Sequence, residues 1–314
     1  MIMRLSIVVP CYNEEPVLQE TTVRLSAVLD SLVEKRKISS DSFILYINDG
    51  SRDMTWTIIE SLHDRNSYVK GLNLAGNVGH QNALMAGLMT AKGYADVLIS
   101  IDADLQDDVS VIEEMVDRYK EGYDIVYGVR SSRDSDTFFK KNTALAFYKL
   151  MSWLGVKSVY NHADYRLMSR RAVEQLGNYK ERNLFLRGIV PLIGYETTSV
   201  YYRRSERFAG ESKYPLSKMF NFAIDGITSF SVKPLRLIAS LGFLFLLCSL
   251  VAVVYTLYVY FNGETVAGWA SLMLSVWFLG SLILIAIGIV GEYIGKIYLE
   301  VKERPRYNIE KFLN

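Results

Sequence analysis

Over the first 130 residues the chain alternates short apolar runs with stretches of helical spacing. Runs typical of buried strands are RLSIVVP, SFILYIND, VKGLNLA, DVLISIDAD and YDIVYGV. Between them, PVLQETTVRLSAVLDSLVEK, MTWTIIESLHDRN, HQNALMAGLMTAKG and VSVIEEMVDRYKEG have helical periodicity. The alternation predicts an α/β domain with a doubly wound, mostly parallel sheet, whose ligand crevice lies outside the carboxyl ends of the strands. Polar loops at residues 10–15, 48–53 and 102–108 follow three of these strands, so we expect them to converge on that crevice.

The pattern changes near the carboxyl end of the chain. Residues 237–261 and 266–291 contain no charged side chain, and each segment is long enough to cross about 30 Å of hydrocarbon as a helix. We therefore predict two membrane spans. The loop between them carries only Glu264, whereas lysines and arginines flank the outer ends, so both termini are expected in the cytoplasm at the inner (plasma) membrane.

A stretch of spaced apolar residues precedes the first span. Residues 214–232 place apolar side chains three and four positions apart, which favours an amphipathic helix in the membrane interface; a helix packed on the soluble domain is the alternative. The predicted organisation is a cytoplasmic domain over 1–213, a juxtamembrane helix over 214–234, spans over 235–261 and 266–291, and a cytoplasmic tail over 292–314.

Composition excludes several classes of protein. The formal net charge of the 314 residues is +1, which gives no argument for nucleic-acid binding. No G-x-G-x-x-G follows the first strand and no P-loop motif occurs, so a dinucleotide oxidoreductase and a P-loop ATPase are not indicated.

Cys11 and Cys248 are expected to be unpaired, and no secretory signal opens the chain. With three histidines and no ligand spacing, His80 and His162 are interpreted as polar loop residues.

The sequence LISIDADLQDD collects acidic residues at one strand end. Asp102 and Asp104 are two positions apart, so their side chains emerge on the same side. A divalent cation would relieve their repulsion, which predicts Mg²⁺ or Mn²⁺ together with a phosphorylated substrate. Asp107 and Asp108 stand directly before a helical segment, where capping favours carboxylates without any catalytic role.

Five motifs in order, IVVPCYNEE, NDGSRD, GNVGHQNALMAG, DADLQDD and ADYRLMSR, followed by two apolar segments, resemble family 2 glycosyltransferases of the polyisoprenyl-phosphate type. This group includes dolichyl-phosphate mannose synthases, and the two-span tail is most similar to bactoprenol glucosyltransferases. The resemblance covers the whole chain and implies a GT-A fold with inverting, metal-dependent sugar transfer. No Q-x-x-R-W motif occurs, which argues against a processive polysaccharide synthase.

The resemblance also implies roles for the donor-side residues. The nucleotide would lie against the loop containing Pro10, Tyr12 and Glu14, and Asp49 would recognise the base. Asp102 and Asp104 match the D-x-D pair, with Asp104 preferred as the direct metal ligand and Gln106 as a second one. Asn48 stands where many relatives have Asp, which bears on the identity of the base.

On the acceptor side the resemblance points to an acid and to phosphate-binding groups. Asp164 would act as a base or orient its neighbours; a turn or salt-bridge role is the alternative. Arg166, Arg207, Ser212 and Lys213 would bind phosphate, although basic residues of 203–218 also suit attraction to anionic lipid headgroups.

The function expected from the sequence is transfer of one sugar, best glucose from UDP-glucose, to polyprenyl (undecaprenyl) phosphate for cell-envelope glycosylation. GDP-mannose or UDP-N-acetylglucosamine are alternative donors. A non-catalytic nucleotide-sugar-binding scaffold and direct transfer to a protein or glycan are further alternatives. Two spans are too few for a solute pathway, so a separate flippase and a downstream transferase are expected; a homo-oligomer is left open.

Overall fold

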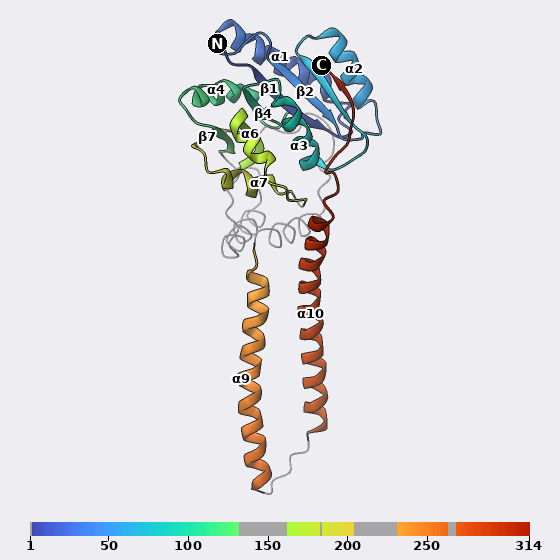
Figure 1. Cartoon of the computed structure of the whole chain (residues 1–314), viewed down its shortest axis with the longest axis vertical. Helices are drawn as coiled ribbons and strands as arrows, with labels where there is room; N and C mark the ends of the chain where they lie inside the picture. The colour runs from blue at the N-terminus through green and yellow to red at the C-terminus, as the bar shows by residue number, and fades with distance from the viewer. Residues whose placement is uncertain (1, 132–161, 183, 204–230, 263–267) are drawn as a thin grey trace. The chain divides into compact units, whose positions relative to one another are not determined.

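The computed structural model describes residues 2–131, 162–182, 184–203, 231–262 and 268–314. The chain divides into two compact units. One comprises residues 1–148, 157–215 and 304–314, and the other comprises residues 149–156 and 216–303. The first is an α/β unit and the second a helical hairpin (Figure 1).

An eight-stranded sheet with the order β7-β5-β6-β4-β1-β2-β3-β8 forms the centre of the α/β unit. Strands β3, β2, β1 and β4 are parallel neighbours, while β6 is antiparallel to both β4 and β5, and β8 is antiparallel to β3. The strands are β1 (Leu5–Cys11), β2 (Phe43–Asn48), β3 (Val69–Leu74), β4 (Val97–Ser100), β5 (Ile125–Arg130), β6 (His162–Ser169), β7 (Thr197–Tyr202) and β8 (Ile309–Leu313).

Helices cover the sheet. They are α1 (Leu18–Glu34), α2 (Thr55–Arg65), α3 (His80–Ala91), α4 (Ile112–Lys120), α6 (Arg170–Gly177) and the short α7 (Leu186–Ile189), with 3₁₀ turns η1 (Val109–Val111) and η2 (Val190–Ile193). The five predicted strands and four predicted helical segments are confirmed within a few residues of their ends. The structure adds β6, β7, β8, α6 and α7, which the sequence patterns did not predict.

Burial on both faces of the sheet explains why the central strands have continuous apolar sequences. Every residue of β1 and β2 is buried, as expected for parallel strands covered on both faces. Helix α3 approaches them closely at Gly87, where a Cβ atom would lie 2.6 Å from side-chain carbons of both Ile47 and Val8. This close packing holds α3 against strands β1 and β2, and it thereby positions the loop that precedes His80.

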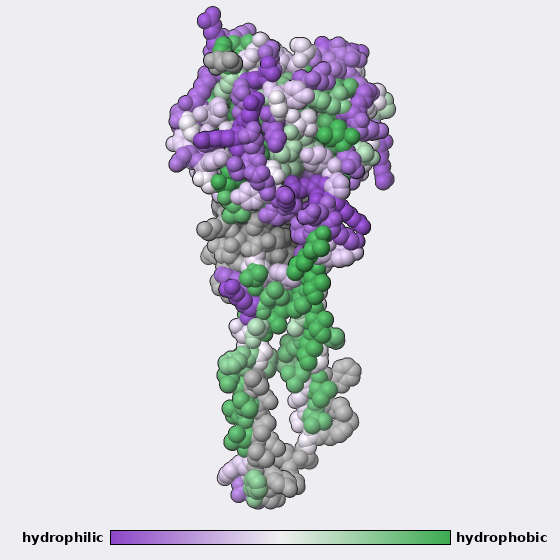
Figure 2. Space-filling model, in the orientation of Figure 1, coloured by the Kyte–Doolittle hydropathy of each residue, from purple (hydrophilic) through white to green (hydrophobic). Residues whose placement is uncertain are grey.

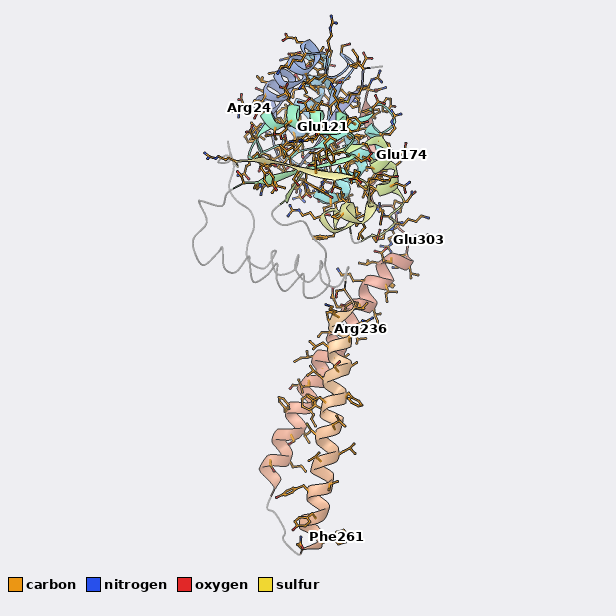
Figure 3. The ribbon with its side chains drawn as sticks, turned by 90° about the vertical axis from the view of Figure 1, so that its left-hand side faces the viewer. Arg24, Glu121, Glu174, Arg236, Phe261 and Glu303 are labelled. Atoms are coloured by element: carbon orange, nitrogen blue, oxygen red, sulfur yellow. The ribbon has the colours of Figure 1, made fainter. Side chains whose placement is uncertain are left out.

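The hairpin consists of α9 (Lys233–Phe261) and α10 (Trp269–Val301). Figure 3 labels Arg236 and Phe261 near the two ends of α9, and Glu303 just beyond α10. Hydrophobic side chains predominate among the coloured atoms on the visible surface of both helices, whereas hydrophilic ones dominate that of the α/β unit (Figure 2). Between the helices, the rings of Phe245 and Phe278 lie 6.4 Å apart.

Among the described residues, one helical segment, Phe278–Val301, is long and apolar enough to cross a membrane. The first predicted span, residues 237–261, lies within α9, and its crossing of a membrane stays a prediction. The predicted juxtamembrane helix lies outside the described residues up to residue 230.

The carboxyl-terminal boundaries differ from those predicted. The helix expected to end at residue 291 continues to Val301, because IGKIYLEV keeps helical spacing beyond the apolar run. Residues 309–313, within the predicted tail, form β8 at the edge of the sheet, where Ala75 N also donates to the carbonyl of Asn308 at 2.9 Å. A five-residue strand with charged residues carries too weak an alternation to be predicted from sequence.

Candidate functional site

The loops after β1 and β2 hold each other through hydrogen bonds between side chains and backbone. Asn13 N donates to Ser51 Oγ at 3.0 Å, and Arg52 N donates to Asn13 Oδ1 at 2.8 Å. Asn13 has a positive φ of 55°, a conformation that asparagine tolerates better than most residues. The two predicted loops are therefore brought together at the carboxyl edge of the sheet.

The predicted nucleotide wall lies in the first of these loops. Pro10 is the buried partner of Ile47 within the sheet, whereas Tyr12 is exposed and available to a ligand. The backbone N of Glu14 donates to Thr55 Oγ1 at 3.0 Å, which joins this loop to the start of α2. Their contact with a nucleotide stays a prediction.

Asp49 connects the second loop to the segment before α3. Its buried carboxylate accepts hydrogen bonds from Val78 N at 2.7 Å and Gly79 N at 3.1 Å. Burial raises the pKa of Asp49, and these two backbone bonds partly offset that effect. Both carboxylate oxygens are thus engaged in shaping the loop, and the base recognition expected of Asp49 stays a prediction.

The acidic motif after β4 separates into residues with different surroundings. Desolvation raises the pKa of Asp102; the neighbouring carboxylates of Asp107, Asp164 and Asp104 add to this, and His80 opposes it. Asp104 is buried, and its Oδ1 accepts from the backbone N of Gln106 at 3.2 Å.

No group of three or more His, Cys, Asp or Glu side chains with metal-binding geometry occurs in the part of the chain that the structure describes. The metal roles of Asp102, Asp104 and Gln106 stay predictions. A cation there would need oxygen ligands from a substrate diphosphate or from water, as is usual for Mg²⁺.

Asp107 and Asp108 have structural partners, as the sequence predicts for Asp108. Asp108 Oδ1 accepts from Ser110 N at 2.9 Å and so caps η1. Asp107 does not cap the helix: its buried Oδ1 accepts from Tyr202 Oη at 2.5 Å and from Arg130 Nη2 at 3.1 Å. It ties β5 and β7 to the loop after β4.

A partly buried ionic cluster lies on β6 and α7. Asp164 Oδ1 pairs with Arg166 Nη2, and Asp164 Oδ2 accepts from Arg187 Nη2 at 3.1 Å. Burial alone would raise the pKa of Asp164, but Arg187, Arg166 and His80 together outweigh it and hold that pKa well below its ordinary value. A carboxylate held in its charged form is a weak proton acceptor at neutral pH, which favours an orienting role over that of a base.

Arg166 is directed into the protein rather than toward the crevice. Its side chain is 1% exposed, and Nη1 donates to the carbonyl of Leu186 at 3.4 Å. The phosphate role expected of Arg166 stays a prediction. Arg187, which lies in no sequence motif, has a side chain 38% exposed and is the more accessible guanidinium. Because it comes from a separate short helix, no motif spacing could have paired it with Asp164.

His80 lies between the donor-side and acceptor-side acids. Its Nε2 is 3.5 Å from Asp102 Oδ1 and 3.9 Å from Asp164 Oδ2. The sequence pattern indicated that His80 is a polar loop residue. In the structure it is the first residue of α3 and lies between the donor-side and acceptor-side halves of the candidate site. The sequence signal for His80 was its place in the GNVGHQNALMAG motif, directly after Gly79.

Three predicted phosphate-binding residues, Arg207, Ser212 and Lys213, lie outside the described residues. The described cysteines, Cys11 and Cys248, are both free, as predicted.

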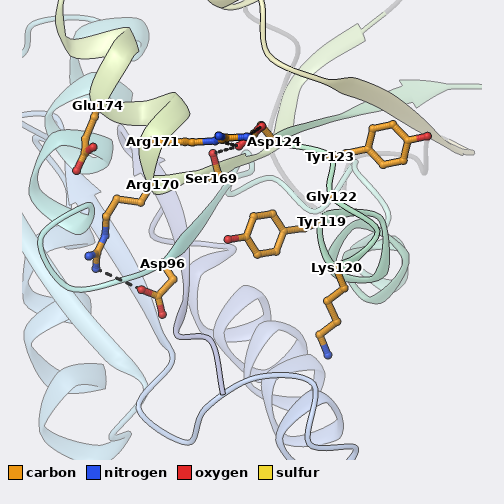
Figure 4. A pocket seen from close by; sticks show the side chains of 10 residues that line it. All are labelled: Asp96, Tyr119, Lys120, Gly122, Tyr123, Asp124, Ser169, Arg170, Arg171 and Glu174. Atoms are coloured by element: carbon orange, nitrogen blue, oxygen red, sulfur yellow. Dashed lines mark hydrogen bonds and ion pairs between the residues drawn. The ribbon is translucent and has the colours of Figure 1, made fainter. Parts of the chain in front are cut away.

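A separate hollow of about 610 Å³ lies at the other end of β4 (Figure 4). Figure 4 shows two of its carboxylates engaged by arginines: Asp96 with Arg170, at 3.5 Å, and Asp124 with Arg171. Hydrogen bonds from Arg171 and Ser169, opposed by desolvation, lower the pKa of Asp124. Asp96 precedes β4 whereas Asp102 follows it, so this hollow lies apart from the converging loops, and we interpret its ion pairs as structural.

Comparison with known proteins identifies the class. The glycosyl transferase family 2 model matches residues 6–177, more than half of the chain, and the chain belongs to this family. A second model, the GtrB C-terminal hairpin, matches residues 233–297, which include α9 and most of α10. Both matches confirm the resemblance that the motifs indicated.

Individual relatives align over nearly the whole chain. The chain is 57% identical to the uncharacterized glycosyltransferase YkoT of Bacillus subtilis, over 98% of this chain and 91% of that protein. It is 41% identical to the SfII prophage-derived bactoprenol glucosyl transferase of Shigella flexneri, over 98% of each. A solved structure, glucosyl-3-phosphoglycerate synthase from Mycobacterium tuberculosis, is a more distant likeness, 17% identical with a TM-score of 0.48, covering 73% of this chain and 79% of that one.

Proposed function

We propose that this glycosyltransferase transfers one sugar, best glucose from UDP-glucose, to a polyprenyl phosphate such as undecaprenyl phosphate, with inversion. The observation that carries the proposal is the meeting of Asp102, His80 and Asp164 at the carboxyl edge of the sheet. The GtrB-type hairpin and the similarity to bactoprenol glucosyl transferases support a lipid acceptor.

The donor diphosphate would be held together with a divalent cation. Desolvation and the neighbouring carboxylates raise the pKa of Asp102, and its side chain is still 37% exposed, so its surroundings suit a cation that neutralises this charge. Asp102 and Asp104 would hold Mg²⁺ or Mn²⁺, with Gln106 as a further ligand. The ion would balance the charge of the departing nucleoside diphosphate.

The acceptor needs little help from a base. A phosphate monoester has a second pKa of about 6 and is largely dianionic at neutral pH. We infer that Asp164 positions Arg187 and His80 instead of removing a proton, because the two arginines hold its carboxylate charged. Arg187 would then face the acceptor phosphate, together with Arg207, Ser212 and Lys213.

The proposed setting is the cytoplasmic face of the inner membrane. Both apolar helices would span the bilayer with the two termini in the cytoplasm, since basic residues flank the hairpin and one acidic residue lies in its connecting loop. The product would require a separate flippase and a downstream transferase.

Purified full-length protein in lipid nanodiscs with undecaprenyl phosphate tests the reaction. Labelled UDP-glucose, UDP-N-acetylglucosamine, UDP-galactose and GDP-mannose are supplied with and without EDTA. We expect label from one donor, UDP-glucose, in the organic phase, abolished by EDTA and by Asp104→Ala. Asp108→Asn is the matched control, because it changes an acid of the same loop that only caps η1.

Each alternative has its own outcome. Organic-phase label from another donor would change the sugar but keep the reaction. Label that stays with protein or glycan would indicate direct transfer. Metal-dependent nucleotide binding without any transfer would favour the scaffold and contradict the proposal.

A further inference from the structure

The carboxyl-terminal strand contacts the donor-side loops through a β-bulge. In the pairing of β3 with β8, Asn73 lies opposite Lys311 and Leu74 opposite Ile309, so Glu310 is the extra residue at the register shift. A bulge redirects the side chain of such a residue. Here the Glu310 carboxylate accepts a hydrogen bond from Asn73 Nδ2 at 2.7 Å.

Asn73 passes this contact on to the loop after β2. Asn48 Nδ2 donates to Asn73 Oδ1 at 2.7 Å, and Asn48 Oδ1 accepts from Ser51 N at 3.2 Å. Ser51 Oγ in turn accepts from Asn13 N in the loop after β1. A continuous row of hydrogen bonds, which we call the Glu310 relay, joins β8 to both donor-side loops through Asn73, Asn48 and Ser51.

The direction of the relay is fixed at its two ends. A backbone N–H can only donate, so it requires the oxygen of the Asn48 amide to face Ser51. A carboxylate can only accept, so it requires the nitrogen of the Asn73 amide to face Glu310. Both amide orientations follow from these ends, and the two side chains then complement each other where they meet.

We propose that Glu310 is a positioning residue for the donor site, and that it requires an amide rather than a carboxylate at position 48. This inference rests on the proposed function in one respect, that the loops after β1 and β2 receive the nucleotide. The carboxyl-terminal strand, only a few residues beyond the hairpin helix α10, thereby becomes part of the donor-side framework.

An aspartate at position 48 would reverse the donor and acceptor roles of the Asn73 amide in the Glu310 relay. Its second oxygen would accept from Asn73, whose amide would have to turn and present its oxygen to the Glu310 carboxylate. Two acceptors would then face each other, and the contact between β8 and the loop would be lost. A glutamine at position 310 can donate to the turned Asn73 and would restore the contact.

Hydrogen exchange on the full-length protein in nanodiscs tests this pairing without any substrate. We compare wild type, Asn48→Asp, Glu310→Gln and the double variant. Asn48→Asp should speed exchange in residues 309–313 and 48–53 about fivefold, the effect of one net hydrogen bond. Glu310→Gln should slow exchange in the Asn48→Asp background, returning it close to the wild-type rate.

Lys311→Gln is the matched control on the same strand. It removes the 2.8 Å ion pair between Lys311 and Glu60 of α2 but leaves the relay intact. We expect exchange in residues 48–53 to stay at the wild-type rate. The affinity for UDP-glucose, measured by calorimetry, should follow the same order as exchange in the loop.

The inference is overturned if Asn48→Asp leaves both segments unchanged, or if the double variant exchanges as fast as Asn48→Asp alone. Because exchange needs no reaction, these outcomes are distinct from failure of the proposed function. Rescue of exchange without UDP-glucose binding would keep the Glu310 relay and reject that donor.

Discussion

Two regions of the candidate site are stabilised in opposite ways. The loops after β1 and β2 are joined by hydrogen bonds that backbone N–H groups donate to side chains, such as that from Asn13 N to Ser51 Oγ. The cluster on β6 and α7 consists of Asp164 between two arginines, one of them almost completely buried. The donor side thus depends on backbone shape and the acceptor side on charge balance. Substitutions should therefore affect the two regions differently.

The largest effect is expected where charge balance is broken. Asp164→Asn leaves the guanidinium of Arg166 buried without a full countercharge, and we expect the free energy of unfolding to fall by about 3 kcal/mol. Sugar transfer should be lost as well. Chemical denaturation followed by circular dichroism measures the first effect, and the nanodisc assay the second.

The double variant Asp164→Leu with Arg166→Met separates stability from activity. Removing both charges should recover most of the lost stability, because no buried ion remains unpaired, while transfer stays absent. If transfer also recovered, Asp164 would have no role in the reaction.

The same cluster predicts a pH dependence. Because the pKa of folded Asp164 is depressed, its contribution to stability is complete above the unfolded-state pKa of about 3.9 and is lost as pH falls below it. Wild type should thus lose stability relative to the double variant on acidification below about pH 4. Equal losses in the two proteins would contradict the ionic role of Asp164.

A smaller effect is expected where shape is altered on the donor side. Gly50 has a φ of +61°, and a Cβ atom there would lie 2.5 Å from Asn77 N and 2.7 Å from Gly76 C. Gly50→Ala should lower the free energy of unfolding by about 2 kcal/mol, through strain and a backbone clash. Thermal unfolding measures this change.

Gly122→Ala is the matched control, because Gly122 also has a positive φ, but a Cβ atom added there would meet no neighbouring group within 4 Å. Its cost should be about 1 kcal/mol, from conformation alone. Equal losses for the two variants would show that the close approach between Gly50 and Asn77 contributes nothing.

The difference between local patterns and contacts between distant residues explains what the sequence could predict. Strands β1 to β5 and helices α1 to α4 were predicted because each has a local periodicity, and the loops that follow the parallel strands must converge at one edge. The pairing of Asp164 with Arg187 and of Asn73 with Glu310 joins residues 23 and 237 positions apart. Such contacts depend on antiparallel strands placed at unpredicted positions, and side-chain patterns carry no signal for them.

The smallest change in stability is expected at Asp102, with the sign reversed. The raised pKa of Asp102 means that its charged form is disfavoured in the folded protein at neutral pH, unlike that of Asp164. Asp102→Asn removes this cost, so the metal-free protein should become more stable, by at most about 1 kcal/mol because the side chain is partly exposed. Transfer should nevertheless fall about 100-fold, since charge stabilisation is lost.

Addition of Mn²⁺ with UDP separates the two roles of this carboxylate. A cation bound partly by Asp102 relieves the burial and repulsion that destabilise the charged carboxylate in wild type, so the thermal midpoint of wild type should rise on addition by more than that of Asp102→Asn, which keeps Asp104. An equal rise in both proteins would mean that Asp102 does not hold the cation. If metal-free Asp102→Asn were instead less stable than wild type, His80 would stabilise the charged carboxylate of Asp102 more than burial and the neighbouring acids destabilise it. Asp102 and Asp164 would then both stabilise the folded protein in their charged forms.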